Sequence, residues 1–224
     1  MPVHRISRFG LVNAYLVEED DGLTLVDTAL PRSQDAILKA AKALGAPIRR
    51  IALTHGHSDH VGSLDALHAA LPEAEVLISA RDARLLAKDT SLDPGEPQDK
   101  IRGGVPGTAT RPTRTFSAGE TVGSLEVHAA PGHTPGQVAF LDPRDRTLIC
   151  GDAYVTLGGV ATAAERHWRF PIVQLVTWHK PTALATAQAL RDLQPLRLAP
   201  GHGKVVESPG AAMDRAITRS LASA

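Results

Sequence analysis

The sequence has little cysteine, no net charge and no long apolar run. Cys150 is its one cysteine, so the chain forms no internal disulfide, which agrees with a reducing compartment. The 24 basic and 24 acidic residues cancel, which favours neither a nucleic-acid backbone nor an anionic membrane surface as partner. No apolar stretch approaches the length of a membrane span, and the first residues lack the apolar core of a secretory signal. We therefore expect a cytoplasmic protein without nucleic-acid or membrane partners.

The sequence does contain enough apolar material for one large unit, since 43% of its 224 residues are hydrophobic. Short apolar runs predict strands, and apolar residues at helical spacing predict helices. Strands are predicted at 11–17, 23–27, 51–53, 76–78, 121–130, 137–141, 147–150 and 196–199, and helices at 33–44 and 61–71 and from about 182 and 208 onward. This pattern, which runs twice along the chain, predicts a single α/β domain over residues 1–224, with two similar halves packed sheet against sheet and helices outside.

Two segments lack this regularity. Residues 89–114 contain four prolines and four glycines, and residues 155–172 carry Trp168 and Phe170. Irregular loops of such length in a compact domain tend to be functional or mobile, so we expect both on the substrate side. The first is predicted to be a flap near the site, either a preshaped wall or a moving lid. Trp168 and Phe170 either line an apolar pocket or close the core.

The densest polar stretch is Thr54-His55-Gly56-His57-Ser58-Asp59-His60, which places three imidazoles and one carboxylate within six residues. A hydrophobic core does not accommodate such polarity, because each buried group needs a partner to offset its desolvation. Three further residues, His133, Asp152 and His202, also follow short apolar strands. Strand ends that meet at one edge of a layered α/β core bring such side chains together. Imidazole and carboxylate suit a divalent metal, and seven candidates exceed what one ion needs.

The dense stretch resembles the signature of the metallo-β-lactamase superfamily. The later motifs follow in that family's order, and they are Pro131-Gly132-His133-Thr134-Pro135-Gly136, Gly151-Asp152 and Pro200-Gly201-His202-Gly203. Residues 13–17 and 25–28 are similar to its first hairpin. The resemblance covers nearly the whole chain. It implies a four-layer αββα metallo-β-lactamase-type sandwich with two metal ions at one edge.

The resemblance also implies how the ligands are shared between two divalent ions, most simply zinc, with iron or manganese as alternatives. His55, His57 and His133 would bind the first ion, Asp59, His60 and His202 the second, and Asp152 would bridge the two. A hydroxide between the ions would be the nucleophile, and Asp59 would be the catalytic residue that orients it. Asp27 is expected to be a supporting carboxylate beside the cluster.

The sequence leaves the roles of several nearby residues open. Tyr154 lies two residues past the expected bridging aspartate, where its phenol would be able to donate to a substrate carbonyl, and its role is not assigned. Acyl-homoserine lactonases, which are similar in pattern, have a tyrosine one position further on, where this chain has Val155. Cys150 is predicted to be a buried structural thiol. His167 and His179 remain open as substrate contacts, and no substrate-binding residue is identified.

Differences from other branches of the family narrow the set of reactions that the resemblance implies. β-Lactamases of this fold are generally exported and lack a bridging aspartate, and glyoxalase II enzymes append a helical region. What remains resembles a small glyoxalase-II-like or lactonase-like hydrolase that acts on a thioester, lactone or carboxylic ester of a small molecule, as a monomer or homodimer. Two alternatives stay open: a mononuclear iron oxygenase resembling persulfide dioxygenases, and a metal-binding module without catalysis.

Overall fold

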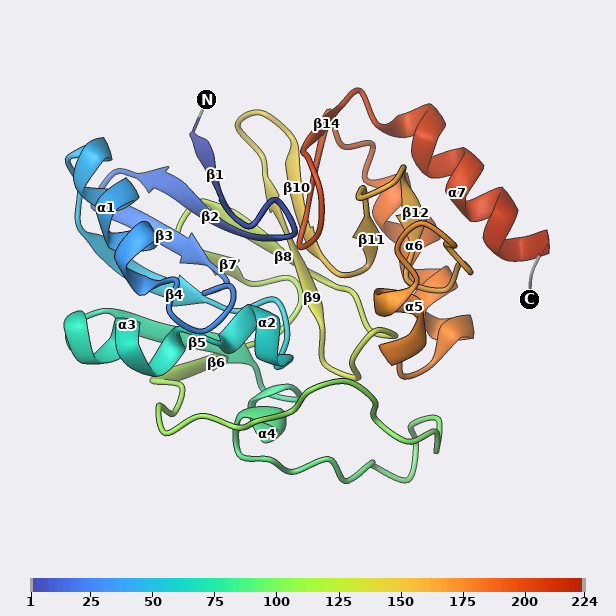
Figure 1. Cartoon of the computed structure of the whole chain (residues 1–224), viewed down its shortest axis with the longest axis horizontal. Helices are drawn as coiled ribbons and strands as arrows, with labels where there is room; N and C mark the ends of the chain where they lie inside the picture. Colours follow the sequence, from blue (N-terminus) through green and yellow to red (C-terminus); the bar gives the residue numbers. More distant parts are fainter. Residues whose placement is uncertain (1, 223–224) are drawn as a thin grey trace.

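A computed structural model describes residues 2–222, and in it two six-stranded sheets face each other (Figure 1). The first sheet has the order β1 (Val3–Arg8), β2 (Val12–Glu19), β3 (Gly22–Val26), β4 (Ile48–Ala52), β5 (Glu75–Ser79) and β6 (Arg114–Phe116). The second has the order β14 (Val206–Glu207), β13 (Arg197–Pro200), β10 (Thr147–Gly151), β9 (Val138–Asp142), β8 (Leu125–Ala129) and β7 (Thr121–Val122). A separate small sheet pairs β11 (Tyr154–Val155) with β12 (Ala161–Thr162).

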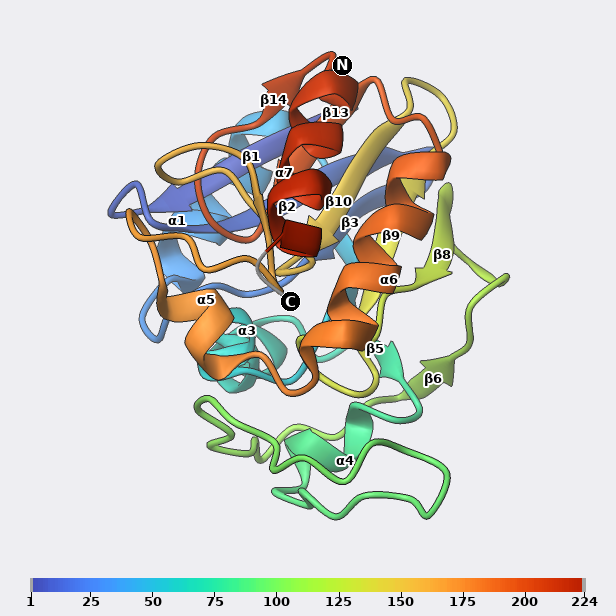
Figure 2. The ribbon, with the colours of Figure 1, turned by 90° about the vertical axis from the view of Figure 1, so that its right-hand side faces the viewer.

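Helices cover the outer face of each sheet. The amino-terminal half contains α1 (Gln34–Leu44), α2 (Ser58–Val61), α3 (Leu64–Ala70) and α4 (Ala83–Leu86), and the carboxy-terminal half contains α5 (Ile172–Val176), α6 (Lys180–Asp192) and α7 (Gly210–Ala222). In Figures 1 and 2, α1 and α3 lie outside the first sheet, and α6 and α7 lie outside the second. The predicted four-layer αββα sandwich is therefore confirmed. No helix within residues 2–222 is long and apolar enough to cross a membrane.

Alternation along the strands of the first sheet produces these layers, because successive strand side chains point to opposite faces. In β2, Leu16 joins the cluster beneath α1 and α3, whereas Tyr15 and Val17 join the cluster between the sheets. In the layer between the sheets, the rings of Phe116 and Phe140 meet edge to face with centroids 5.7 Å apart. A third apolar cluster lies between the second sheet and helices α6 and α7.

The predicted long elements are all present, and some are divided. Of the predicted helix over 61–71, α3 covers residues 64–70 and only Val61 lies in α2, and the predicted strand over 121–130 is two strands, β7 and β8. The turn between these strands places Gly123 at φ +59°, which favours glycine. Strands β1, β6, β11, β12 and β14 and helices α4 and α5 were not predicted.

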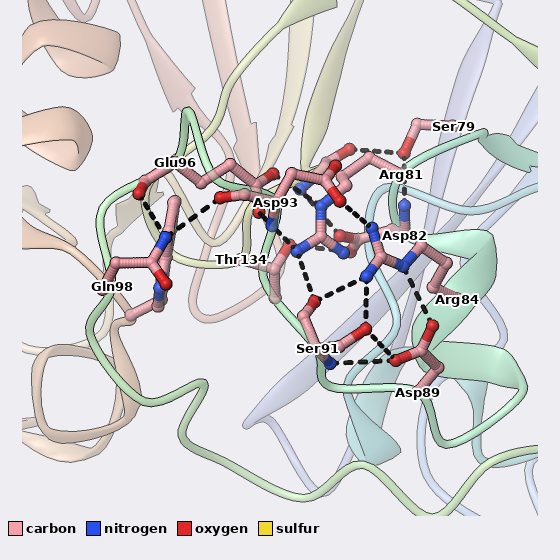
Figure 3. Close-up of polar contacts among 12 residues, drawn as sticks. Ser79, Arg81, Asp82, Arg84, Asp89, Ser91, Asp93, Glu96, Gln98 and Thr134 are labelled. Atoms are coloured by element: carbon pink, nitrogen blue, oxygen red, sulfur yellow. Dashed lines mark hydrogen bonds and ion pairs between the residues drawn. The ribbon is translucent and has the colours of Figure 1, made fainter.

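The two segments predicted to be irregular differ in how much secondary structure they contain. Residues 89–113 contain no helix or strand, as predicted, although β6 begins at Arg114. The prediction for 155–172 is only partly right, because β12 lies within that segment and α5 begins at its end. In Figure 3, the Arg81 guanidinium donates to both carboxylate oxygens of Glu96, at 2.6 and 2.8 Å, and Arg84 pairs with Asp89 and Asp93. This network holds the first segment against α4 and favours a preshaped wall over a moving lid.

Candidate metal centre

The seven predicted ligands meet at one edge of the sandwich, each after the end of a strand. His55 to His60 follow β4, and the other three residues follow β8, β10 and β13. Their nitrogen and oxygen atoms form three overlapping groups in which all ligand atoms lie within 4.8 Å of one another. These groups are His55, His57 and His133; His55, His60 and Asp152; and Asp59, His60 and His202. The structure thus brings together all seven residues that follow these strand ends.

Hydrogen bonds on the far side of the first group define which imidazole nitrogens are free. His57 Nε2 lies 2.9 Å from the carbonyl oxygen of Arg102, which only accepts, so this nitrogen carries the proton. His133 Nδ1 lies 3.1 Å from Thr177 Oγ1, whose own hydrogen goes to a carbonyl such as that of Val173 at 2.8 Å. The remaining nitrogens, His57 Nδ1 and His133 Nε2, are then both unprotonated and face each other at 2.9 Å. Two lone pairs at that distance repel, and a shared cation removes the repulsion.

Asp27 orients two further ligands from the end of β3. Its Oδ2 accepts hydrogen bonds from His60 Nδ1 and from Thr54 Oγ1, both at 2.8 Å, and its Oδ1 accepts one from the Thr54 amide. Since the Thr54 hydroxyl donates to Asp27, it accepts from His55 Nδ1 at 3.0 Å. One carboxylate thus fixes the tautomers of both imidazoles and turns Nε2 of each toward the cluster. Asp27 therefore lies beside the cluster, as expected from the sequence.

The second group mixes imidazole and carboxylate. His202 donates from Nδ1 to the carbonyl oxygen of Leu11 at 3.0 Å, and its Nε2 lies 3.3 Å from Asp59 and 3.2 Å from Asp152. Burial lowers the pKa of His202, but the charge of Asp152 and the hydrogen bonds to Asp152 and Asp59 together outweigh burial and raise the pKa to about 10. Burial raises the pKa of Asp59, but His60 and His202 together bring it down to about 2. These carboxylates are ionised at neutral pH and attract positive charge.

His55 Nε2 is buried and has no hydrogen-bond partner among the described residues, whereas His60 Nε2 and Asp152 Oδ1, which also meet no other partner, lie 3.3 Å from each other. A buried polar atom left unpaired costs about 1–3 kcal/mol, so an unpaired nitrogen that faces this cluster needs an explanation. Burial, followed by the neighbouring imidazoles, lowers the pKa of His55 well below its usual value, which keeps its lone pair available. Neutral imidazole beside carboxylate is the donor set that divalent first-row metals accept, so the residues fit the metal ions that the family implies.

The pocket above the cluster has a polar floor and an apolar side. It has a volume of about 250 Å³ and is lined by five of the seven candidate ligands, all but His55 and His60, together with Ser58, Gly103, Gly104, Ile172, Val173 and Val176. A Cβ on Gly103 would lie 2.7 Å from His57 Nε2, and its φ of +87° also favours glycine. The segment 89–114 therefore closes directly over His57, as predicted.

The structure resolves two roles that the sequence leaves open. Tyr154 is fully buried and donates from its hydroxyl to the carbonyl oxygen of Ala187 at 2.7 Å, so it faces α6 and not a substrate. Trp168 does not close the core, because it is 79% exposed, and it lines a cavity other than the pocket above the candidate ligands. Phe170 does approach the site, with its ring centroid 5.2 Å from that of His202. Cys150 is buried, as predicted.

His167 and His179, which the sequence offers as candidate substrate contacts, both make internal contacts. His179 precedes α6, and its Nδ1 accepts a hydrogen bond from the Thr182 amide, which caps that helix. His167 Nε2 lies 3.1 Å from the carbonyl oxygen of Leu157. Neither residue lines the pocket above the cluster.

Asp82 is a site residue that the sequence reasoning missed. It follows β5, and its carboxylate accepts hydrogen bonds from the Gly56 amide at 3.0 Å, the Thr134 hydroxyl at 2.7 Å and the Gly136 amide at 2.7 Å. Figure 3 shows Asp82 beside Thr134. It thus joins the loop of the first histidines to the loop of His133. Its position after an apolar strand was the signal that could have found it.

Replacing Asp82 with asparagine should loosen both ligand loops. The amide offers one acceptor in place of two and brings an NH2 group toward backbone donors, which costs about 2–3 kcal/mol. Thermal denaturation should show a fall in Tm of roughly 4–10 °C, together with weaker metal binding. The matched control is Asp20→Asn, an exposed position that should keep the wild-type Tm. An unchanged Tm in the Asp82 variant would show that the two loops do not depend on this carboxylate.

Comparisons with known proteins agree with this geometry. The model of the Metallo-beta-lactamase superfamily matches residues 7–202. An uncharacterized protein of Bacillus subtilis (strain 168), YobT, is 49% identical over 210 residues, which are 93% of this chain and 90% of that protein. A hydroxyacylglutathione hydrolase of Synechococcus sp. (strain JA-3-3Ab) is 33% identical over 144 residues, 62% of this chain and 47% of the relative.

A solved structure, that of TTHA1623 in a di-iron-bound form, is 27% identical in sequence and matches with a TM-score of 0.67. The match covers 94% of this chain and 96% of that one. The relatives and the histidine and aspartate cluster together support a metallohydrolase. With a family model that spans most of its length and a sandwich of the same architecture, the chain belongs to the metallo-β-lactamase superfamily.

Proposed function

We propose that the protein is a dinuclear metal-dependent hydrolase that cleaves an ester-like bond, with a thioester as the first candidate. The observation that carries this proposal is the orientation of the five cluster histidines. Each donates one ring nitrogen to a fixed acceptor, namely Thr54, Arg102, Asp27, Thr177 or Leu11, and turns the other toward the cluster. Such anchoring of the outer nitrogen is typical of metal-ligating histidine.

The proposed ligands are His55, His57 and His133 for one ion and Asp59, His60 and His202 for the other. Asp152 is the proposed bridge, because its Oδ2 lies 3.4 Å from His133 Nε2 and 3.2 Å from His202 Nε2, between the two groups. Two divalent cations held there supply an activated water at neutral pH and a polarised substrate carbonyl. Zinc is the proposed metal, and the di-iron-bound relative makes iron the main alternative.

Asp59 is proposed to be the catalytic residue of the chain itself. Its side chain is 31% exposed, whereas those of His202 and Asp152 are 5% and 3% exposed. It lines the pocket and stays ionised at neutral pH, since its pKa is about 2. The carboxylate can therefore accept a hydrogen bond from an attacking water and hold it in line with the substrate carbonyl.

The apolar side of the pocket indicates where an acyl group would lie. Ile172 and Val176 come from α5, and Ile172 is 57% exposed although it lines the pocket. An apolar acyl group that covered it would gain about 25 cal/mol for each Å² removed from water. The choice of a thioester is supported by the relative named hydroxyacylglutathione hydrolase, since an acyl group on the glutathione sulfur is a thioester. That relative is matched over 47% of its length, so the substrate remains part of the proposal.

Metal analysis joined to a substrate panel tests this function. The purified chain should contain about two divalent ions and hydrolyse at least one thioester, lactone or aryl ester, with zinc, iron and manganese measured separately. His57→Ala should lose at least about 100-fold in rate, because it removes a ligand that faces His133. Tyr154→Phe is the control, since that hydroxyl contacts only Ala187 among the described residues, and its rate should not change.

Three outcomes would contradict the proposal. Equal hydrolysis by the wild type and His57→Ala would show that the cluster does not carry the activity. A single Fe(II) per chain with oxygen uptake on a persulfide would favour the oxygenase alternative. Two bound ions with no loss of any activity in Asp59→Asn would favour a metal-binding module without catalysis.

A further inference from the structure

A second cavity, of about 390 Å³, lies between residues 158–169 and helix α7. Figure 2 shows this loop beside α7, on the side of the molecule that carries α5. Ala212, Arg215 and Arg219 line it from one face of α7, at helical spacing. The loop contributes two more arginines, Arg166 and Arg169.

The cavity carries an excess of positive charge in a chain with no net charge. Its lining has four guanidinium groups and one carboxylate, that of Glu165, which Arg219 binds at 2.5 and 3.1 Å. The side chains of Arg166 and Arg215 make no hydrogen bond or ion pair with any residue in 2–222, and both are exposed. Arg169 makes a contact of 3.3 Å, to the carbonyl oxygen of Gly158. Three positive charges therefore have no carboxylate partner, which is the arrangement that a polyanion would balance.

Trp168 adds a flat apolar surface to this charged cavity. Its indole is 79% exposed and lies under the guanidinium of Arg169, 5.0 Å from the ring centroid. An indole left in water with an arginine beside it is suited to stacking against a planar ring that bears negative charge nearby.

The cavity and the metal centre lie on two sides of one turn. The Phe170 amide donates to the carbonyl oxygen of His167 at 3.1 Å, which closes the turn. His167 and Trp168 face the arginine cavity, whereas the Phe170 ring lies 5.2 Å from that of His202. Ile172, two residues further on, lines the pocket above the ligands. The arginine cavity and the pocket above the candidate ligands are therefore separated by one turn of the chain.

We propose that the arginine cavity binds the nucleotide end of a phosphate-bearing carrier whose acyl thioester is cleaved at the metal centre, as in a coenzyme A thioester. Guanidinium groups bind phosphate through paired hydrogen bonds, and Trp168 would stack on the purine. A glutathione carrier fits less well, because it has no planar ring and its ammonium offsets one of its two carboxylates. The proposal rests on the proposed function, which supplies the thioester cleavage.

Titration of the purified chain with coenzyme A tests the cavity without any turnover. Calorimetry and tryptophan fluorescence should show binding in roughly the micromolar range that weakens as salt rises. Arg215→Glu should raise Kd at least about 10-fold and Arg215→Gln by less, since two charges and one charge are lost respectively. Trp168→Ala should also weaken binding and remove most of the fluorescence change. Lys39→Glu on α1, an exposed charge reversal, is the matched control and should bind as the wild type does.

Different results would contradict the cavity assignment and the proposed function. No binding of coenzyme A at about 1 mM, or tighter binding of glutathione, would overturn the cavity assignment even if thioesters are hydrolysed. An Arg215→Glu variant that folds, by its Tm, and binds coenzyme A normally would overturn it too. Binding that depends on Arg215 and Trp168 supports the cavity assignment even where no hydrolysis is detected, in which case the proposed function is what fails.

Discussion

Replacing Asp152 with alanine is expected to lower hydrolysis by at least about 1,000-fold, equivalent to roughly 4 kcal/mol of barrier, and to remove at least one metal ion per chain. Among the described residues, Asp152 is the one whose carboxylate lies within 3.4 Å of an imidazole from each proposed ion group, His133 and His202. Without it, Asp59 is the one carboxylate left in the proposed ligand set. Five converging imidazoles with a single negative charge hold two divalent cations poorly, because most of the positive charge of the cations is then compensated only by ions from solvent.

The loss should be visible in metal content before activity is considered. Elemental analysis of Asp152→Ala after dialysis should give about one ion or fewer, against about two for the wild type. Asp192→Ala is the matched control, since that aspartate is exposed at the end of α6 and should leave both ions and the rate unchanged. An Asp152→Ala chain that keeps two ions and the full rate would show that the bridge is assigned to the wrong residue.

The candidate ligands could be picked out from the sequence because each follows, within a few residues, an apolar strand that the pattern identifies or stands in the dense stretch after one. His133, for instance, follows the strand β8 by four residues, and the fold carries such strand ends to one edge. The groups that hydrogen-bond to the outer nitrogens of these histidines were harder to predict from the sequence. Arg102 contributes a backbone carbonyl and Thr177 a hydroxyl from a loop, and neither residue type is distinctive in a sequence. Such contacts depend on how loops fold back, which local spacing does not encode.

Tyr154 shows where the two-residue period of a strand gives the wrong direction for a side chain. Tyr154 lies two residues after Asp152, so both side chains would lie on the same face if the strand continued. The chain turns first, because Gly151 adopts φ +50° and the Ala153 amide donates to the carbonyl oxygen of Cys150. The phenol is thereby directed to α6. A single glycine in the left-handed region reverses the expected direction of the side chain, and periodicity gives no notice of it.

The fold was predictable where a strand is an apolar run long enough to be recognised in the sequence. β2 and β9 bury apolar residues over most of their length and were identified. β11, β12 and β14 have two residues each, too few for any periodicity, and they form through pairing with distant partners. β1 is longer but carries polar residues at most positions, and its ladder with β2 defines it. Long-range hydrogen bonding, not local propensity, places these strands.

Gly201→Ala is expected to damage the metal centre with little effect on the rest of the fold. A Cβ at Gly201 would lie 2.3 Å from Asp152 Oδ1 and 2.5 Å from His60 Cε1, closer than real contacts allow. The backbone cannot easily withdraw, because the Gly201 amide donates to the Gly151 carbonyl and its own carbonyl accepts from the Asn13 amide, both at 2.8 Å. Its φ lies outside the left-handed region, so alanine itself adds no backbone strain there.

The added methyl must therefore displace the proposed bridge and a ligand, which costs about 1–3 kcal/mol locally. Metal content should fall below two ions per chain, and hydrolysis should fall by at least about 100-fold, because a shift of about 1 Å at a catalytic group has that effect. The matched control is Gly95→Ala, whose Cβ would meet nothing within 4 Å, and it should match the wild type in metal content, rate and Tm. Full metal loading and rate in Gly201→Ala would mean that Asp152 and His60 work from positions other than those in the structure, and the two-group assignment of ligands would have to be abandoned.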